Sequence, residues 1–258
     1  MVSPIDRLKQ IVERLRSPDG CPWDREQTHE SLKPHLIEEC YELIDSIDEN
    51  DDQGMQEELG DLLLQVVLHA QMASEEGRFD FDAVADVISE KLIRRHPHVF
   101  GDTRLATSDA VLKQWDAIKR REKTDRASAL DGVPRGLPAL AKAQKTQSKA
   151  ARVGFDWADA EGSLQKVNEE VKELQQADTG EKLAEELGDL LFSAVNFARK
   201  SKLDAEGLLQ AATRKFSERF RKMEALAESR GLVFSSLTLS EMDKLWDEVK
   251  AGQAVSKQ

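Results

Sequence analysis

Residues 186–192 read Glu-Leu-Gly-Asp-Leu-Leu-Phe, and residues 58–64 read Glu-Leu-Gly-Asp-Leu-Leu-Leu. In each stretch two acidic residues stand three apart at the start of a long apolar run. Positions i and i+3 lie on one face of a helix, so both carboxylates can point into the same space. A buried carboxylate is costly unless it is paired or bound to a cation. The repeated stretch therefore indicates helices and, within them, a metal site.

The repetition extends well beyond this stretch. A loop with a tryptophan, an acidic pair, a second acidic pair, a basic pair and a final tryptophan follow in the same order in both halves. The matching residues are Trp23 with Trp157, Glu39 and Glu42 with Glu170 and Glu173, Glu58 and Asp61 with Glu186 and Asp189, Lys91 and Arg95 with Lys215 and Arg219, and Trp115 with Trp246. This order predicts a tandem duplication with small differences in loop length.

Composition narrows the class of protein. The 258 residues are 40% hydrophobic and only 5% aromatic, and helix formers with a period near 3.6 dominate, so we expect an all-α protein. Lys and Arg number 37 against 49 Asp and Glu, a net charge of −12, which argues against a nucleic-acid partner. No apolar run approaches the roughly 20 residues of a membrane span. Two isolated cysteines and a start without a signal peptide predict a cytoplasmic protein.

Helix start and stop signals predict the domain organisation. Ser3 followed by Pro4 starts a first helix, and Cys21–Asp24 is expected to form a loop. The segment from Leu62 to Ala70 is apolar nearly all round and is expected to be buried. His96-Pro97-His98 is interpreted as a helix stop. We predict an N-terminal helical domain at 1–122, a linker at 123–137 and a C-terminal helical domain at 138–258.

The four acids of each half form the strongest candidate site. If consecutive helices pack antiparallel, as short connections favour, the carboxylates of two helices face each other. Hard oxygen ligands without His or Cys suit Mg²⁺, with Mn²⁺ as a substitute. Acids in the first turn of a helix also simply favour the helix dipole, so a single pair would carry little weight. The proposed ligands are Glu170, Glu173, Glu186 and Asp189, with a second set at Glu39, Glu42, Glu58 and Asp61.

Three further features of the second half are ambiguous from sequence alone. Lys215 and Arg219 lie four apart on one helical face and could hold a polyphosphate, or they could belong to a solvated charged face. Trp246 could stack on a base or pack a helix seam. Lys166, one turn before Glu170, is an additional phosphate candidate. No phosphate-binding glycine loop and no second Glu-x-x-His pair occurs, which excludes the P-loop and di-iron classes.

These residues resemble a known family. The pattern Gly20-Cys21-Pro22-Trp23-Asp24, the acidic repeats, and the stretches 76–81 (Glu-Gly-Arg-Phe-Asp-Phe), 94–100 (Arg-Arg-His-Pro-His-Val-Phe) and 153–157 (Val-Gly-Phe-Asp-Trp) are similar to those of MazG proteins over essentially the whole chain. The resemblance implies an all-α NTP pyrophosphatase fold with two MazG-like halves and a homodimer.

The resemblance also implies an activity. MazG proteins hydrolyse ribo- and deoxynucleoside triphosphates, ATP included, to the monophosphate and pyrophosphate with Mg²⁺, and the second half is usually regarded as the catalytic one. Carried over by position, the catalytic and metal-binding residues would be Glu170, Glu173, Glu186 and Asp189. Nucleotide contacts would come from Lys166, Glu170, Glu186, Asp189, Lys215, Arg219 and Trp246, and more weakly from Lys91, Arg95 and Trp115.

Two hypotheses of different class follow. In the first, water attacks the α-phosphorus of a nucleoside triphosphate, and the enzyme serves nucleotide-pool housekeeping. In the second, the chain is a non-catalytic helical module that senses nucleotides or scaffolds a partner. In the second class the acids would lack a positioned cationic partner, and the paired positions Lys215 and Arg219 count against it.

Overall fold

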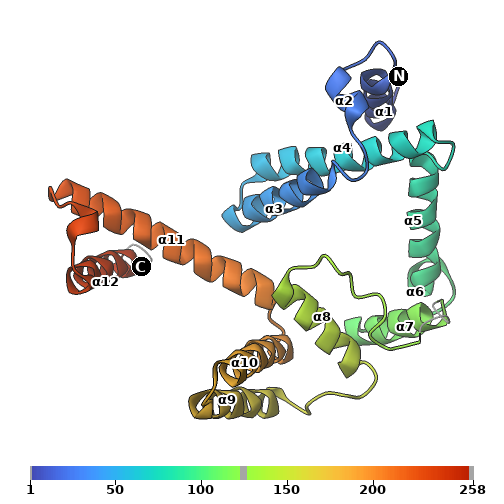
Figure 1. Cartoon of the computed structure of the whole chain (residues 1–258). Helices are drawn as coiled ribbons and strands as arrows, with labels where there is room; N and C mark the ends of the chain where they lie inside the picture. Colours follow the sequence, from blue (N-terminus) through green and yellow to red (C-terminus); the bar gives the residue numbers. More distant parts are fainter. Residues whose placement is uncertain (1, 123–126, 256–258) are drawn as a thin grey trace. The chain divides into compact units, whose positions relative to one another are not determined.

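The computed structural model describes residues 2–122 and 127–255, and within these ranges every regular element is helical (Figure 1). The chain divides into two compact units, residues 1–124 and 125–258. The first contains α1 (Pro4–Arg16), α2 (Pro22–Glu26), α3 (Lys33–Glu49), α4 (Asp52–Glu75), α5 (Phe81–Arg95), α6 (Pro97–Phe100) and α7 (Ser108–Arg121). The second contains α8 (Ala139–Ala151), α9 (Ala160–Gln176), α10 (Gly180–Lys200), α11 (Ala205–Ser229), a 3₁₀ turn (Phe234–Ser236) and α12 (Leu239–Val255).

The all-α class predicted from the sequence is confirmed. None of the described helices combines the length and the apolar character that crossing a membrane requires. Residues 123–126 of the predicted linker lie outside the described ranges.

Side-chain caps set the starts of the long helices. The Ser3 hydroxyl accepts a hydrogen bond from a first-turn N–H of α1, and Pro4 occupies the first helical position, where no N–H is needed. Asp51, Asp159 and Thr179 cap α4, α9 and α10 in the same way. Because the caps fix where α9 and α10 begin, they also fix where along this helix pair the acidic residues face each other.

The first unit has one apolar core, which joins α1, the segment before α3 and α4. Its members are Val12, Leu32, Val67, Leu68 and Met72, with Ile5, Leu8, Leu64 and Phe81 packed against them. Val12 and Leu32 are both within 1% of complete burial. The connection between Trp23 and α3 delivers Leu32 to this core, so the loop is anchored by hydrophobic burial.

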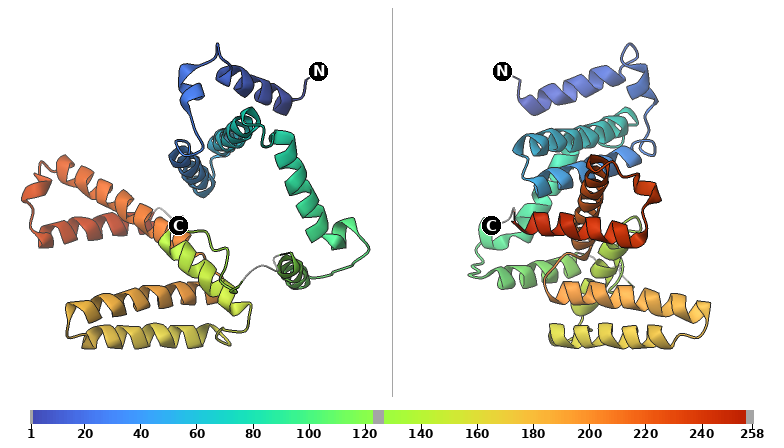
Figure 2. Two further views of the ribbon diagram at one scale, coloured as in Figure 1. Left: turned by 45° about the vertical axis from the view of Figure 1, so that its right-hand side comes forward. Right: turned by 90° about the vertical axis from the view of Figure 1, so that its left-hand side faces the viewer.

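The second unit has two smaller cores. One joins α8, α10 and α11 through Val195, Ala198 and Ala205, with Leu140 and Ala143 packed against them. The other joins α11 and α12 through Met223, Ala227 and Leu245. The hairpins α9–α10 and α11–α12 are therefore separate pieces of architecture joined through α8 and α11 (Figure 2).

Two sequence predictions about this fold are wrong in part. Cys21–Asp24 was expected to be a loop, yet Pro22 begins the short helix α2, because proline's fixed φ suits the first helical position. The helix stop predicted at His96-Pro97-His98 is confirmed, since α5 ends at Arg95 with His96 as its C-cap, and a separate short helix begins at Pro97. The 62–70 segment is buried on one side only. Val67 is 2% exposed, but Leu63 and Val66 are 38% and 42% exposed.

A pair of histidines fastens the loop before α3 to α4. The rings of His29 and His69 are stacked, with 2.7 Å between their Nδ1 atoms, and the guanidinium of Arg78 lies 2.6 Å from His29 Nε2. Arginine can only donate, so His29 Nε2 accepts and its Nδ1 donates to His69. Both rings are therefore neutral. Burial lowers the pKa of His69, and the neighbouring His29 lowers it further.

This pair predicts an acid-dependent loss of stability in the first unit. A histidine whose folded pKa is lowered binds its proton more readily when unfolded, so stability should fall as the pH drops below about 6.5. We expect the melting temperature of the wild type to decrease between about pH 7.5 and 5.5, and that of His69→Phe to decrease less. Thermal melts monitored by circular dichroism measure this. Parallel curves for the two proteins would contradict the prediction.

Candidate metal and nucleotide site

The hairpin of α9 and α10 brings three of the four predicted acids of the second half together. Glu170 on α9 and Glu186 and Asp189 on α10 each offer a carboxylate oxygen, and these oxygens all lie within 4.8 Å of one another. Glu170 is 3% exposed, Glu186 is half-buried and Asp189 is exposed. Mg²⁺ holds oxygen ligands at about 2.1 Å, so small side-chain rotations would place all three on one ion. The all-oxygen donor set therefore fits Mg²⁺ or Mn²⁺.

Glu173 is not a member of this close group, although its charge acts on it. Burial raises the pKa of Glu186, and the carboxylates of Glu173 and Glu170 raise it further. Like charges gathered on half-buried positions explain this direction. A divalent cation would relieve both the repulsion and part of the desolvation.

Lys166 contacts this group directly. Its Nζ lies 2.6 Å from a carboxylate oxygen of Glu170 and 2.7 Å from one of Glu169. The single ammonium group thus bridges Glu170, which belongs to the acidic group, and Glu169, which does not. These hydrogen bonds raise the pKa of Lys166 well above its ordinary value, so it stays protonated. Glu169 was not singled out from the sequence, although its i+3 spacing from Lys166 is a detectable signal.

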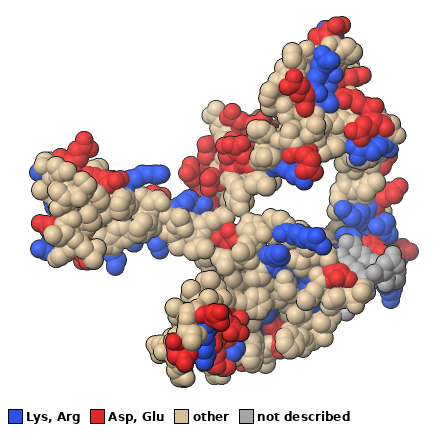
Figure 3. All heavy atoms as spheres, viewed as in Figure 1, with Lys and Arg blue, Asp and Glu red and all other residues tan. Residues whose placement is uncertain are grey.

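The first half forms a matching group. Glu39 on α3 and Glu58 and Asp61 on α4 bring their oxygens within 4.8 Å of one another, and Glu42 lies outside the group. Burial raises the pKa of Glu39 and Glu58, as do the neighbouring carboxylates. Acidic side chains gather visibly on the α3–α4 hairpin, whereas on α9–α10 they are mixed with basic ones (Figure 3).

The two groups differ in the cation beside them. The position four residues before the first acid is Lys166 in the second half and His35 in the first. His35 lies 3.5 Å from Glu38, outside the acidic group. The first half therefore has no ammonium in the place that Lys166 occupies.

The predicted phosphate cations lie on other helices. Lys215 and Arg219 are on α11 and Trp246 is on α12, which packs along α11 and lies apart from α9 and α10 (Figures 1 and 2). The Arg219 guanidinium lies 5.9 Å from the Trp246 ring centroid, and Phe216 lies 5.2 Å from the same ring. Trp246 packs against the α11–α12 core. Within one chain the structure does not bring these residues to the acids.

The corresponding first-half residues are engaged differently. Arg95 and Arg94 on α5 both form ion pairs with Glu122 at the end of α7, and these bonds lower the pKa of Glu122 to about 2. Trp115 packs edge-on against His96, with 5.4 Å between ring centroids. Lys91 is half-buried on α5. Arg95 is thus neutralised by an acid of its own unit.

Comparison with known proteins gives a consistent result. The MazG nucleotide pyrophosphohydrolase domain matches residues 27–100 and again residues 159–223, which include both acidic groups, and this double match supports the tandem duplication. The chain is 53% identical over 248 residues to the nucleoside triphosphate pyrophosphohydrolase/pyrophosphatase MazG of Thermotoga maritima, covering 96% of both chains. It is 48% identical over 257 residues to the nucleoside triphosphate pyrophosphohydrolase of Escherichia coli K12, covering 96% of this chain and 98% of that one.

The crowded acids predict a stability cost that a cation removes. A carboxylate with a raised folded pKa destabilises the fold at pH values above that pKa. Without divalent cations, Glu186→Gln should therefore raise the melting temperature by a few degrees at neutral or alkaline pH. Added Mg²⁺ should stabilise the wild type and leave this variant nearly unchanged. Glu185→Gln, one residue away and outside the group, is the matched control. An equal response of all three proteins to Mg²⁺ would count against a metal site here.

Proposed function

The chain belongs to the MazG family of nucleotide pyrophosphohydrolases, and on that premise we propose that it hydrolyses ribo- and deoxynucleoside triphosphates to the monophosphate and pyrophosphate. The observation that carries this proposal is the group formed by Glu170, Glu186 and Asp189 with Lys166 at its edge. Oxygen ligands suit a hard cation that binds phosphate oxygens, and an ammonium suits the phosphate itself.

Each residue of the site would have a distinct role in the reaction. Glu170, Glu186 and Asp189 would hold Mg²⁺, with Glu173 close enough for its charge to act on Glu186. The bound cation would neutralise phosphate charge and lower the pKa of a water molecule. A carboxylate of the cluster would accept the proton of the water that attacks the α-phosphorus. Lys166 would turn from Glu170 toward a phosphate oxygen once the cation occupies the acids.

Two differences between the halves support our proposal that the second half is the catalytic one. The first half has His35 where the second has Lys166, so its acidic group lacks an adjacent ammonium. Its Arg95 is also committed to Glu122, an arrangement that would compete with a phosphate. These features suit the first half to a regulatory or structural role on the same scaffold.

A homodimer would complete the site. The cations Lys215 and Arg219 and the ring of Trp246 lie on the α11–α12 hairpin, away from the acids of the same chain. Apolar side chains on both hairpins are also open to solvent, among them Leu187 and Leu191 on α10 and Phe216 on α11, at 48%, 54% and 56% exposure. Packing two copies against each other would cover these faces and bring one chain's cations to the other's acids. We place this enzyme in the cytoplasm.

The activity is tested by pyrophosphate release from a mixed nucleoside triphosphate pool with Mg²⁺. We expect Glu186→Gln to lose at least about 100-fold in kcat and Glu58→Gln to keep most of its rate, because only the second half has an ammonium beside its acidic group. Hydrolysis in heavy-oxygen water should place the label in the monophosphate. Label in pyrophosphate would exclude attack at the α-phosphorus, and no release by the wild type would favour the nucleotide-sensing module.

Subunit complementation tests the shared site. Glu186→Gln and a Lys215→Ala, Arg219→Ala double variant should each be inactive alone. In a refolded equal mixture, half of the dimers are mixed, and each mixed dimer has one intact site, so about a quarter of the wild-type rate should return. Mixing Glu186→Gln with Asp189→Asn is the control, because both changes damage the same set of acids. No recovery in the first mixture would place acids and cations in a single chain.

A further inference from the structure

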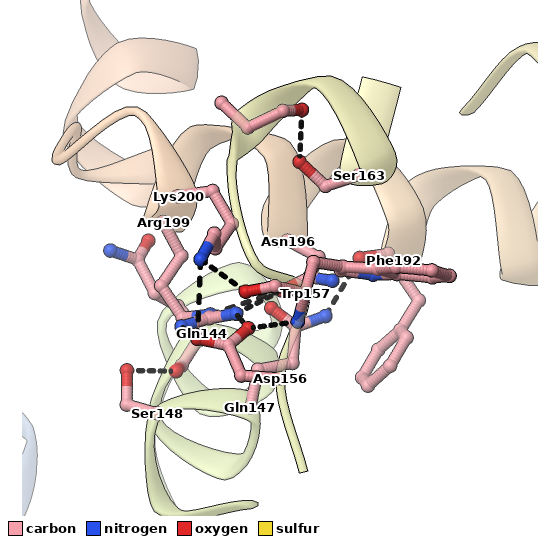
Figure 4. Close-up of polar contacts among 11 residues, drawn as sticks. Gln144, Gln147, Ser148, Asp156, Trp157, Ser163, Phe192, Asn196, Arg199 and Lys200 are labelled. Atoms are coloured by element: carbon pink, nitrogen blue, oxygen red, sulfur yellow. Dashed lines mark hydrogen bonds and ion pairs between the residues drawn. The ribbon is translucent and has the colours of Figure 1, made fainter. Parts of the chain in front are cut away.

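The second unit contains a cavity of about 350 Å³ between α8, the loop 153–157 and the C-terminal part of α10. Aromatic side chains and two amides dominate its lining: Phe155, Trp157, Phe192, Gln147 and Asn196. Figure 4 shows Trp157, Phe192, Gln147 and Asn196. None of these residues belongs to the acidic group or to the predicted cations. The volume lies within the range of about 300–1,000 Å³ typical of small-molecule sites.

In the first unit, aliphatic side chains occupy the positions equivalent to two of the residues that line this cavity. The ninth residue of α1 is Val12 and the ninth of α8 is Gln147; the tenth residue after Glu58 is Leu68 and the tenth after Glu186 is Asn196. Val12 and Leu68 belong to the continuous apolar core of the first unit. The second unit thus has two amides where its twin has two aliphatic side chains.

A third difference removes volume. The residue seven positions before the first acid is Leu32 in the first half and Ser163 in the second. Both are fully buried, at 1% and 0% exposure, but Leu32 fills the core whereas the Ser163 hydroxyl bonds back to the carbonyl of Ala160. Gln147 and Asn196 line the cavity directly, whereas Ser163 replaces a core leucine without being one of the lining residues.

The amides are held in defined orientations. Gln147 Nε2 donates to the backbone carbonyl of Phe192 at 2.8 Å, and Gln147 Oε1 is buried without a hydrogen-bond partner among the described residues. Asn196 Oδ1 accepts from Arg199 at 2.7 and 3.0 Å, which leaves its Nδ2 as the donor that Arg199 does not engage. An unsatisfied buried acceptor is rare and costly, so a ligand donor at Gln147 has a physical reason to bind.

The charges at the cavity cancel. Arg199 forms a two-pronged ion pair with Asp156, and Lys200 also reaches Asp156 at 3.4 Å and the Trp157 carbonyl at 2.7 Å (Figure 4). The pairing with Arg199 lowers the pKa of Asp156, which keeps the carboxylate ionised. With its one lining cation and its one lining anion joined to each other, the cavity favours an uncharged ligand over a phosphate.

We propose that this cavity binds an uncharged purine nucleoside, with the base among the aromatic side chains and its amino edge between Gln147 and Asn196. Flat aromatic walls stack on a base, and an amide pair reads an adjacent donor and acceptor such as those on adenine. Adenosine offers such an edge at N6 and N1 and another at N6 and N7, and it carries no charge. None of the lining residues belongs to the acidic group, although Phe192 lies one turn after Asp189 on α10, and the existence of the cavity does not depend on the hydrolytic activity.

The proposal is tested by measuring the binding of adenosine to the full chain with ligand-observed NMR and calorimetry. Purine riboside, which lacks the amino donor, should bind about tenfold more weakly. The Gln147→Val, Asn196→Leu double variant carries the first unit's own residues and should lose adenosine binding. Ala150→Leu keeps both amides but narrows the cavity with the larger residue that α1 has at the equivalent position, Leu15, and should lose binding too. Melting curves and pyrophosphate release establish that each variant is folded.

Glu186→Gln distinguishes this site from the hydrolytic one. It should bind adenosine with unchanged affinity while triphosphate hydrolysis is lost. Loss of adenosine binding in Glu186→Gln would place the nucleoside in the hydrolytic site and overturn the proposal. It would also be overturned if adenosine does not bind the wild type, or if it binds folded Ala150→Leu and the double variant as tightly as the wild type.

Discussion

The crowding of carboxylates inside a two-helix hairpin is the constraint on which the rest of this protein depends. Glu170, Glu186 and Asp189 repel one another at positions where burial already disfavours charge. Such a group persists only if the surrounding helices are stable enough to hold it or a cation offsets it. Caps at Asp159 and Thr179 and the packing of α9 along α10 meet the first condition.

Much of this was predictable because its causes are local. The i, i+3 spacing of the acids, the Ser3-Pro4 start and the repeat order are written in consecutive residues, and they gave the all-α class and three members of each acidic group. Glu42 and Glu173 were expected in those groups too, but helix phase sets a direction without setting the distance across a helix pair. The separation of Trp246 from the acids, and the cavity beside Gln147, depend on how whole helices pack, which no short pattern encodes.

The two halves show how one scaffold can diverge while keeping its acids. A lysine in one half and a histidine in the other, at positions 166 and 35, change the electrostatics beside an otherwise similar triad. Glu122 at the end of α7 neutralises Arg95 in the first half, and the position equally far beyond Trp246 is Gln253, which carries no charge. Each change involves one side chain, and none disturbs the helices. The differences therefore lie in charge placement and core volume.

The exchange of Leu32 for Ser163 also has a consequence for motion. In the first unit the chain after Trp23 is anchored by a leucine in the core and by the paired histidines, whereas in the second unit residues 154–157 line the cavity and α9 begins three residues after Trp157. Segments with few buried apolar contacts open at lower free energy than segments tied to a core. Backbone amides around Gly154–Trp157 should thus exchange with solvent deuterium faster than those of the segment that ends at Leu32. Local opening of the second unit should therefore begin in this loop.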